Sequence, residues 1–426
     1  MLMNKFGLIT RVTGILRAVK KRDTINKLTK CDVLLICLDV DRGDLKFGLP
    51  YSKLLDSVHE DLTAKGYICK QFAPPLSLVV GKKAWAEPYS ANRLFLATHI
   101  VGKFKNLISS IQKRSALPPD YAAHAVYKKV LEKVQPMFIV VIGASSVLCW
   151  EARKLKIPVL ELLHGIGYDS VKWGWDKETV ENLPTHILSL DPVSTESFSK
   201  LNEKGIKTIE IPHPWYSRFD IDAVKSDIDP KWLERPNSIP KDKKVILISL
   251  TWGYDGDHSP YDYYANILPN GMLPEELLDV IKQTRKEIFW CLRRHPVQVR
   301  SNKYDKQIDF LNAIVSECPN SEWQESTTST INALLSLCAG HISMMSMTAY
   351  EAAAMGVKSL LLCPTLKGSR ENANLFSDLE RDGYAVKGDF NANYILEWVT
   401  SVEKTNPRSF NLSTQSNWEI LLKELQ

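Results

Sequence analysis

Short apolar runs alternate with helix-period patterns along the first half of the chain. The runs have the length and continuous apolar character of buried strands, and they lie at residues 32–40, 67–72, 137–142, 159–163, 186–190 and 208–211. Between them, apolar residues recur every three or four positions, which predicts helices at residues 51–65, 90–133 with a break at Pro118-Pro119, 143–155 and 194–204. This alternation is typical of parallel sheets with crossover helices.

The same alternation begins again at residue 244. It predicts strands at residues 244–250, 288–292, 323–324, 341–345 and 359–363. Helices are predicted at residues 274–286, 307–315, 331–337 and 348–355, and the chain after residue 371 is predicted as several helical pieces. Residues 212–244 are rich in Pro, Asp, Lys and Ser and have no long apolar run, which indicates a linker between two domains.

We therefore predict an α/β fold with two Rossmann-like domains that face a central cleft. The length of 426 residues suits two or three domains. We expect a basic segment at 1–30, an N-terminal domain at 31–215, a linker at 216–240, a C-terminal domain at 241–390 and a helical segment at 391–426. Ligands of such sheets bind where loops follow the carboxyl ends of strands, so polar residues directly after strands are the candidates for function.

Composition and charge exclude several classes of protein. Hydrophobic residues make up 44% of the chain and charged residues 24%, which excludes disordered, collagen-like and disulfide-stabilised miniprotein classes. Residues 1–30 contain eight basic residues and one acidic residue, whereas the other 396 residues contain 46 basic and 48 acidic ones. Because the body of the protein is nearly neutral, its bulk charge excludes nucleic acid as a partner.

The basic segment at residues 1–22 has the pattern of an amphipathic helix. Its apolar residues fall within an arc of about 120° on a helical wheel. They are Leu8, Ile9, Val12, Ile15, Leu16 and Val19. Such a helix either lies on anionic membrane lipid or packs on the protein with its charges in water, and the sequence leaves both interpretations open. Arg11 and Arg17 interrupt any signal-peptide core, and no run reaches the ~20 apolar residues that span a bilayer.

The eight cysteines are scattered, and none has CxxC or another metal-like spacing. Several lie in apolar runs, which predicts buried free thiols and a cytoplasmic protein. His, Asp and Glu form no cluster with convincing ligand spacing, so we predict neither a metal nor a cofactor.

A predicted strand of the first half runs into a glycine-containing loop with the sequence Glu161-Leu-Leu-His164-Gly165-Ile-Gly167-Tyr-Asp. Small residues in the loop let backbone N–H groups approach a ligand. A carboxylate inside an apolar strand is costly without a partner, so Glu161 is a candidate general acid or base. The alternative is a glutamate on a strand edge followed by a glycine turn.

Two carboxylates follow the first strand of the second half, in the sequence Thr251-Trp-Gly-Tyr-Asp255-Gly-Asp257. Carboxylates in a glycine-containing loop suit nucleophilic or general-base catalysis, and Asp255 is the first candidate. Because Asp-Gly is also a common turn signal, a plain turn is the alternative.

A cationic cluster ends the next strand, in the sequence Arg293-Arg294-His295-Pro296-Val-Gln-Val-Arg300. Pro296 biases His295 away from the helical region and stops the strand. Arginine binds phosphate and carboxylate in a bidentate manner, so the cluster predicts an anion site. The alternative is a charged rim at a strand end.

Hydroxyl residues join a later strand to a helix of small residues, in the sequence Ser343-Met-Met-Ser346-Met-Thr348-Ala-Tyr-Glu351. Helix N-termini bind phosphate, and Glu351 is placed to hold a ribose, so we expect a nucleotide here. The alternative is plain helix capping by Ser346 or Thr348, with Glu351 completing a capping box.

The order of these motifs resembles that of GT-B glycosyltransferases, whose C-terminal domain holds a nucleotide-sugar donor. The segments at 252–256 and 295–300 are most similar to those of the bacterial retaining β-Kdo transferases of lipopolysaccharide O-antigen and capsule assembly. The resemblance covers the two-domain order of the whole chain, and its specific motifs are confined to residues 161–169 and 251–356. The acidic triplet of bacterial sialyltransferases, two Asp or Glu residues and Gly, is missing, which disfavours that relative.

The resemblance implies that CMP-Kdo is the substrate and that neither a metal nor a cofactor is needed. Asp255 would attack the anomeric carbon with retention, Asp257 would be the second candidate, and Glu161 would be the acid or base. The residues implied to bind the donor are His295, Pro296, Arg293, Arg294, Arg300, Ser343, Ser346, Thr348 and Glu351. The loop residues implied to line the cleft are His164, Gly165 and Gly167.

The resemblance also implies a surface-polysaccharide acceptor that is lipid-linked. Residues 1–22 would then attach the protein to the inner face of the bacterial inner membrane. Three alternatives remain open: a GT-B transferase of CMP-sialic acid or of a UDP- or GDP-sugar, a non-catalytic sugar-nucleotide or glycan-binding module, and a sugar-nucleotide epimerase of the same architecture.

Overall fold

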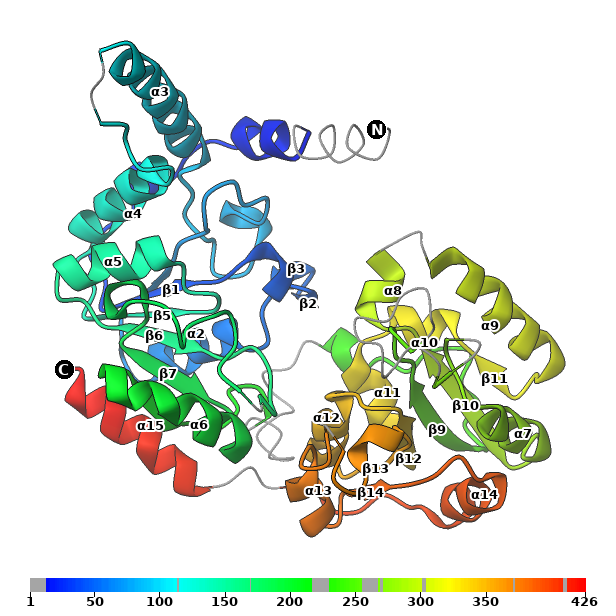
Figure 1. Cartoon of the computed structure of the whole chain (residues 1–426). Helices are drawn as coiled ribbons and strands as arrows, with labels where there is room; N and C mark the ends of the chain where they lie inside the picture. Colours follow the sequence, from blue (N-terminus) through cyan, green and yellow to red (C-terminus); the bar gives the residue numbers. More distant parts are fainter. Residues whose placement is uncertain are drawn as a thin grey trace. The chain divides into compact units, whose positions relative to one another are not determined.

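The computed structural model describes residues 13–112, 115–168, 170–216, 230–254, 267–268, 271–300, 304–370, 372–408 and 412–426. The chain divides into two compact units (Figure 1). The first combines Met1–Trp215 with Asn411–Gln426, and the second is Tyr216–Phe410.

A parallel sheet of six strands, in the order β4-β1-β5-β6-β7-β8, forms the centre of the first unit. Its strands are β1 (Val33–Ile36), β4 (Cys69–Gln71), β5 (Phe138–Val141), β6 (Val159–Leu162), β7 (His186–Ser189) and β8 (Lys207–Glu210). The chain enters at β1, places β4 on one side and continues with β5 on the other. The strand order therefore reverses between β1 and β5, which is where ligands of such sheets bind.

Helices cover both faces of this sheet because successive strand residues point to opposite sides. On β1, Leu34 and Ile36 pack with α4 and α5, whereas Val33 and Leu35 pack with α2 and α15. The helices of this unit are α2 (Leu55–Ala64), α3 (Asn92–Ile111), α4 (Tyr121–Val134), α5 (Ser146–Lys154), α6 (Pro192–Ser199) and α15 (Leu412–Glu424).

The second unit has its own parallel sheet, in the order β11-β10-β9-β12-β13-β14. Its strands are β9 (Lys244–Ser249), β10 (Ile288–Arg293), β11 (Ser321–Glu322), β12 (Gly340–Ser343), β13 (Lys358–Leu361) and β14 (Ala385–Lys387). Numbered along the chain, the order is 3-2-1-4-5-6, the dinucleotide-binding order of doubly wound folds. Here the order reverses between β9 and β12.

On one face of the second sheet, Val245 and Leu247 of β9 and Phe289 of β10 pack with α11 and α12. The helices of this unit are α7 (Glu275–Gln283), α8 (Pro296–Arg300), α9 (Asp305–Glu317), α10 (Gln324–Thr328), α11 (Ile331–Leu337), α12 (Thr348–Ala354), α13 (Ser377–Arg381) and α14 (Ala392–Ser401). Two parallel sheets with crossover helices confirm the predicted α/β class with two Rossmann-like domains.

Three local predictions were wrong. A hairpin of β2 (Asp44–Lys46) and β3 (Leu49–Tyr51) follows β1 and was not predicted. The strand predicted at 323–324 is β11, which lies two residues earlier, because α10 begins at Gln324. The region after residue 371 is not purely helical, since it contains β14 beside β13.

The predicted C-terminal segment 391–426 is divided between the two units. Its first helix, α14, belongs to the second unit, whereas α15 packs on the first sheet. The indole N–H of Trp418 on α15 donates to a carboxylate oxygen of Asp61 at 3.0 Å, and Lys207 lies 3.0 Å from Glu424.

Of the eight cysteines, all are free and all but Cys69 are buried. Within the described ranges, no helix has both the length and the apolar character needed to cross a bilayer.

Candidate functional site

Three loops leave neighbouring strands at the carboxyl edge of the second sheet, where its strand order reverses. The last residue of β9, Ser249, is in register with Arg293 of β10 and with Ser343 of β12, so these strands end at one level. The loops that follow are residues 251–254, 294–298 and 344–348. The first of them turns at Gly253, whose φ of 85° lies in the left-handed region that favours glycine.

A buried histidine holds these strands together directly below the loops. His341 of β12 makes hydrogen bonds of 2.9 Å with Ser249 of β9 and 2.9 Å with Ser359 of β13. Burial lowers its pKa to about 3, so the imidazole is neutral at physiological pH. His341 is therefore a structural residue that joins β12 to β9 and β13.

His295 has a defined orientation at this edge. The backbone N–H of Val297 donates to its Nδ1 at 3.2 Å, so the proton of the neutral imidazole lies on Nε2. The rings of His295 and Trp252 lie 6.2 Å apart, centroid to centroid. Nε2 is thus a donor suited to an anionic oxygen of a ligand, as the sequence predicts for this residue.

Gln298 positions this loop, and the sequence analysis did not select it. Its amide is 1% exposed and accepts a hydrogen bond of 2.7 Å from the backbone N–H of His295. The amide N–H group donates to Gln307 at 3.0 Å and to the carbonyl of Thr251 at 3.4 Å. Gln298 thereby joins the loop after β10 to the loop after β9. Its position three residues after His295 was the only available signal.

The two arginines before His295 hold the protein's own backbone. One nitrogen of Arg293, Nη1, donates to the carbonyls of Ser326 and Ser329 at 2.6 Å each, at the carboxyl end of α10. Arg294 is buried, donates to the carbonyl of Gln298, and lies 5.9 Å from the centroid of Trp323. The structure therefore gives both a positioning function that the sequence did not indicate. The side chain of Arg300 lies outside the described part.

Two buried donors at this edge have no hydrogen-bond partner within the described part of the chain. They are the hydroxyl of Thr251 and the Nε–H of Arg294. Both residues are bound to Gln298 through other atoms. Buried donors are usually paired, so each of these two needs an acceptor from a ligand, from water or from the part of the chain that is not described.

The hydroxyl residues after β12 are linked in a chain. The backbone N–H of Ser346 donates to Ser343 at 3.1 Å, and the Ser346 hydroxyl donates to that of Thr348 at 3.0 Å. The Ser346 hydroxyl also accepts the backbone N–H of Thr348, the first residue of α12, at 3.2 Å, so capping by Ser346 is present although Met347 itself provides no side-chain cap. Glu351 lies in the first turn of α12 and is partly exposed, without forming the predicted capping box.

Asp255 and Asp257 lie outside the described residues. The described chain reaches Tyr254, which is buried and donates from its hydroxyl to Cys363 Sγ at 3.3 Å. The loop after β9 is therefore attached to the loop after β13 one residue before Asp255.

In the first unit, Glu161 of β6 lies beside the place where the strand order reverses. Its carboxylate accepts hydrogen bonds from the backbone N–H groups of Gly143 at 2.8 Å and Ala144 at 2.7 Å. The side chain is 1% exposed, so in this structure it holds the loop after β5 and does not face solvent. Burial raises its pKa to about 8, against the effect of the two N–H donors, and the nearby Asp41 raises it further.

Glu161 should make stability depend on pH. Its folded pKa of about 8 lies above the ordinary value of 4.5, so the folded state retains the proton longer. The contribution of Glu161 to the free energy of unfolding should therefore be greatest at pH 4.5 and should decrease as the pH rises to 8. Glu161→Gln cannot ionise and lacks this contribution, so the free energy of unfolding of the wild type, taken relative to that of the variant, should decrease across this range in urea unfolding. An equal pH dependence in the two proteins would contradict the assignment.

The loop after β6 is held by the protein itself. The backbone N–H of Gly167, predicted to approach a ligand, donates to Asp191 at 3.1 Å, and that of Tyr168 donates to Ser194 at 3.0 Å. A side chain at Gly165 would meet the hydroxyl of Tyr168 at 2.8 Å. His164 is exposed and lies 3.3 Å from the same hydroxyl. His164 is thus the member of this loop that is open to a ligand.

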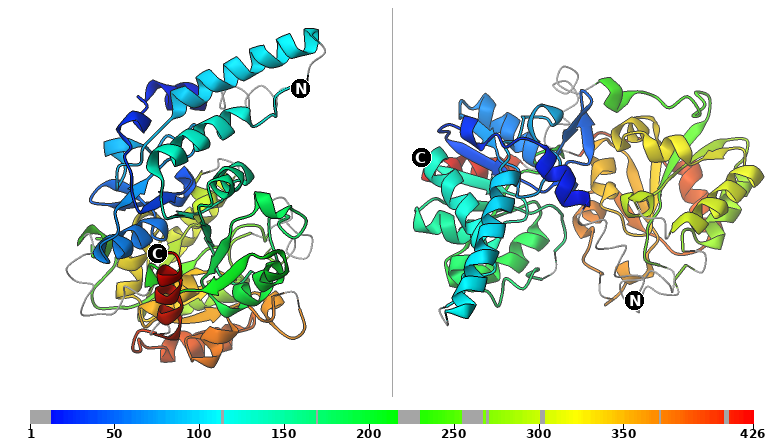
Figure 2. Two further views of the ribbon diagram at one scale, coloured as in Figure 1. Left: turned by 90° about the vertical axis from the view of Figure 1, so that its left-hand side faces the viewer. Right: turned by 90° about the horizontal axis from the view of Figure 1, so that it is seen from above.

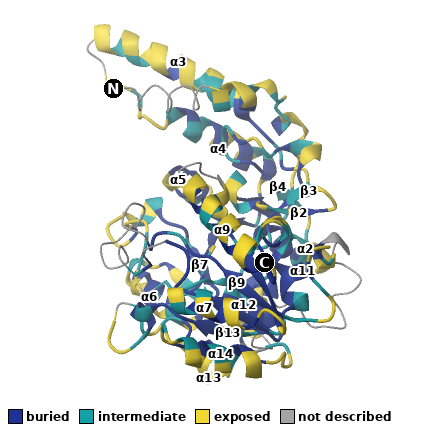
Figure 3. Cartoon of the chain, turned by 90° about the vertical axis from the view of Figure 1, so that its right-hand side faces the viewer, coloured by how far each residue is buried: buried dark blue, intermediate teal, exposed yellow. Residues whose placement is uncertain are grey.

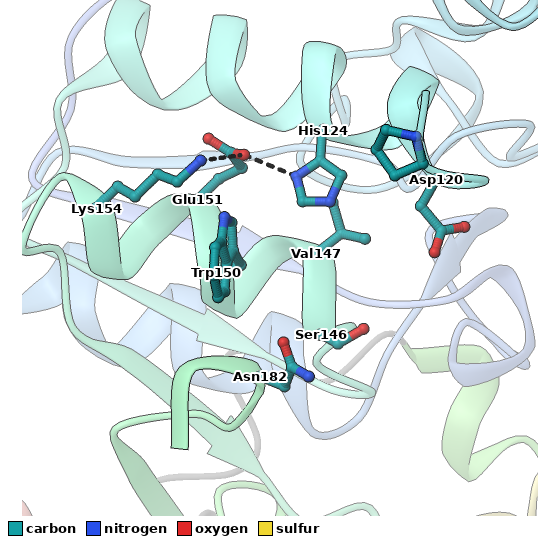
Figure 4. A pocket seen from close by; sticks show the side chains of 9 residues that line it. Asp120, His124, Ser146, Val147, Trp150, Glu151, Lys154 and Asn182 are labelled. Carbon is teal, nitrogen blue, oxygen red and sulfur yellow. Dashed lines mark hydrogen bonds and ion pairs between the residues drawn. The ribbon is translucent and has the colours of Figure 1, made fainter. Parts of the chain in front are cut away.

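A separate cavity of about 570 Å³ lies between α4 and α5 of the first unit (Figure 4). His124 of α4 and Lys154 of α5 both pair with Glu151, at 2.7 and 3.3 Å. Trp150 borders the cavity, with the ammonium of Lys154 5.4 Å from its ring centroid. The polar groups of this pocket therefore already bind one another, with the carboxylate of Glu151 shared between His124 and Lys154. Among the described residues, no group of three or more His, Cys, Asp or Glu could hold a metal ion.

Solved structures share this fold, whereas no family model and no curated protein matches the sequence. UDP-GlcNAc 2-epimerase from Neisseria meningitidis, bound to UDP-GlcNAc, matches with a TM-score of 0.54 at 12% identity, over 92% of this chain and 98% of that one. The enzyme from Methanocaldococcus jannaschii matches with a TM-score of 0.56 at 11% identity, over 92% and 100%. At such identities the likeness shows a GT-B-like fold and nothing finer.

Proposed function

We propose that this chain is a GT-B glycosyltransferase that binds a nucleotide-activated sugar at the carboxyl edge of its second sheet. The observation that carries the proposal is the meeting of three polar loops where the strand order β10-β9-β12 reverses. This is the position at which doubly wound sheets bind nucleotides. The structural neighbour from Neisseria meningitidis is bound to UDP-GlcNAc, which supports a nucleotide sugar as the ligand class.

The donors at this edge suit a phosphate group. Nε2–H of His295 and the hydroxyl of Thr348 would bind the phosphate oxygens, Ser346 would orient the Thr348 hydroxyl, and Glu351 would bind the ribose. The unpaired donors of Thr251 and Arg294 would meet a further anionic group, such as a sugar carboxylate. Donors that are positioned before reaction stabilise a leaving phosphate without a metal ion.

For the sugar we propose Kdo carried by CMP, on the strength of the sequence resemblance. Asp255 would form a bond to the anomeric carbon while the bond from that carbon to the CMP phosphate breaks. An acceptor hydroxyl would then attack the same carbon, pass its proton to water and release Asp255 as a carboxylate, so that two inversions give retention. The acceptor would be a bacterial surface glycan. Glu161 is buried and holds the loop after β5, so we assign it to positioning rather than to proton transfer.

A second candidate is a sugar-nucleotide 2-epimerase. It is favoured by the likeness to UDP-GlcNAc 2-epimerases over 92% of this chain. An epimerase converts its nucleotide sugar without an acceptor, whereas a transferase releases free nucleotide as sugar is transferred. Incubation with UDP-GlcNAc alone and with CMP-Kdo plus a glycan therefore separates the two.

Replacement of His295 by alanine should weaken CMP binding by about 10- to 100-fold, because one charge-assisted hydrogen bond to phosphate is lost. Isothermal titration of CMP and of UDP into the wild type and the variant measures this effect. His99→Ala, an exposed histidine on α3, is the matched control and should leave the affinity unchanged.

An unchanged affinity for CMP in His295→Ala would contradict the proposal that the carboxyl edge of the second sheet binds the nucleotide. Tighter binding of UDP than of CMP would remove the Kdo assignment and leave the coarser proposal. Binding of CMP without turnover on any glycan would favour a binding module over an enzyme.

A further inference from the structure

Helix α3 carries an unusual apolar surface. Six of its large side chains are 46–75% exposed, and they form what we call the α3 apolar face: Ile100, Val101, Phe104, Leu107, Ile108 and Ile111. At 100° per residue they occupy an arc of about 120°, one continuous stripe along the helix. Figure 2 shows α3 projecting from the first unit, and Figure 3 shows its exposed surface.

The opposite side of α3 is already packed. Gly102 is buried against Tyr121 of α4, where an added Cβ would lie 3.2 Å from the ring. Asn106 exchanges hydrogen bonds with the backbone of Leu117, of which the shorter is 2.6 Å. The helix is therefore anchored along one side, and its apolar stripe is directed outward as a preformed surface.

The charges around this stripe are all of one sign. Lys103 and Lys105 lie on its two sides on the helical wheel, and both are exposed. Residues 88–119 contain five basic residues and no acidic ones. Long basic side chains beside an apolar face place their ammonium groups at the level of lipid headgroups.

The basic N-terminal segment is attached to the start of this same helix. Residues 13–20 are helical, and Arg93 of α3 donates to the carbonyls of Val19 at 2.8 Å and Lys20 at 3.2 Å. Both oxygens of Asp23 accept hydrogen bonds from the first backbone N–H groups of α3. The described residues 13–22 of this segment contain four basic residues and no acidic ones, so their charge adds to that of α3.

We propose that the α3 apolar face inserts into the surface of an anionic lipid bilayer, with the basic residues 13–22 lying against the headgroups. Lipid is favoured over a second copy of this chain, because a symmetric contact would bring the lysines of two α3 helices together. The polar side of α3 is packed on α4, so the helix lies in the interface plane. The proposal concerns the first unit and does not rest on the proposed function.

The test uses the full chain and sedimentation with vesicles. The mixed vesicles contain phosphatidylglycerol and phosphatidylcholine at a ratio of about one to one. Wild type should bind them, and it should bind vesicles of pure phosphatidylcholine at least several-fold more weakly. The triple variant Phe104→Ser/Leu107→Ser/Ile111→Ser should partition about tenfold or more weakly into the mixed vesicles. The variant Lys103→Glu/Lys105→Glu should have a smaller preference for the anionic lipid than the wild type, because the basic residues 13–22 remain.

A matched control changes three equally exposed apolar residues elsewhere on the first unit, in the variant Val40→Ser/Ile68→Ser/Ile420→Ser. It should bind the mixed vesicles within about twofold of the wild type. Unimpaired vesicle binding by the α3 triple variant would overturn the proposal. A wild-type dimer that this variant converts to a monomer would overturn it too, because it would assign the face to a second copy. Nucleotide affinity, measured on the same samples, should not change, so failure here is distinct from failure of the donor site.

Discussion

Replacing Asp255 by asparagine is expected to lower turnover by about three orders of magnitude or more, because an amide cannot attack the anomeric carbon as a carboxylate does. Affinity for CMP should stay within about threefold of the wild type, since the donors that bind phosphate lie on other loops. Release of CMP from CMP-Kdo with a glycan acceptor measures turnover, and calorimetry measures affinity.

The position of Asp255 in the chain supports this expectation. It directly follows Tyr254, which is buried and is bound to Cys363, so the loop starts from an anchored residue at the reversal of strand order. The carbonyl of Tyr254 also accepts a hydrogen bond from the backbone N–H of Leu268 at 3.3 Å. Both ends of this loop therefore meet at the same buried residue.

Asp257→Asn is the matched control, since it makes the same chemical change two residues further on. It should reduce turnover by less than about tenfold if Asp255 is the nucleophile. If Asp257→Asn caused the large loss of turnover and Asp255→Asn the small one, the attack would be assigned to Asp257. Survival of turnover in both variants would show that neither carboxylate attacks, and the double displacement would be wrong.

Most strands of both sheets could be predicted because buried parallel strands are continuous apolar runs. The run at 359–363 became β13, and the run at 137–142 became β5, each within two residues. The break at Pro118-Pro119 separates α3 from α4 as expected, since proline cannot continue a helix. These features depend on local pattern alone, which is why they are visible in sequence.

The hairpin of β2 and β3 could not be seen in the same way. Its strands are three residues long, and Pro50 lies within the second, which normally argues against a strand. The turn depends on positive φ angles at Phe47 (52°) and Gly48 (77°), of which only the glycine is a recognisable signal. The strand β14 is equally short, and its pairing with β13 depends on tertiary contact.

In the functional site, too, some features could be predicted from the sequence and others could not. The loops after β9, β10 and β12 could be located from the sequence, because each follows an apolar run. The roles within them could not, since Arg293 is bound by carbonyls 33 and 36 residues further along the chain. The sequence of a cationic cluster does not indicate which of its arginines will bind backbone carbonyls of the folded protein and which will be available to a ligand.

Gly356→Ala should destabilise the second unit by about 3–5 kcal/mol, which combines backbone strain with a steric clash. Gly356 follows α12 with a φ of 70°, and an added Cβ would lie 2.1 Å from the carbonyl oxygen of Thr405. That segment cannot easily withdraw, because the backbone N–H of Thr405 donates to the carbonyl of Gly356 at 2.8 Å and that of Arg408 donates to Ala353 at 2.9 Å. Urea unfolding measures the loss.

Gly383→Ala separates the two contributions. Gly383 follows α13 with a φ of 77°. As at Gly356, the backbone N–H of the next residue donates a hydrogen bond to a carbonyl of the preceding helix. No atom lies within 4 Å of an added Cβ at Gly383, so only backbone strain of about 1–2 kcal/mol should appear. The excess in Gly356→Ala therefore measures the contact between α12 and residues 405–408, which attaches this C-terminal segment to the second unit where β13 begins. Equal losses in the two variants would show that residues 405–408 move away freely and do not contribute to the stability of this unit.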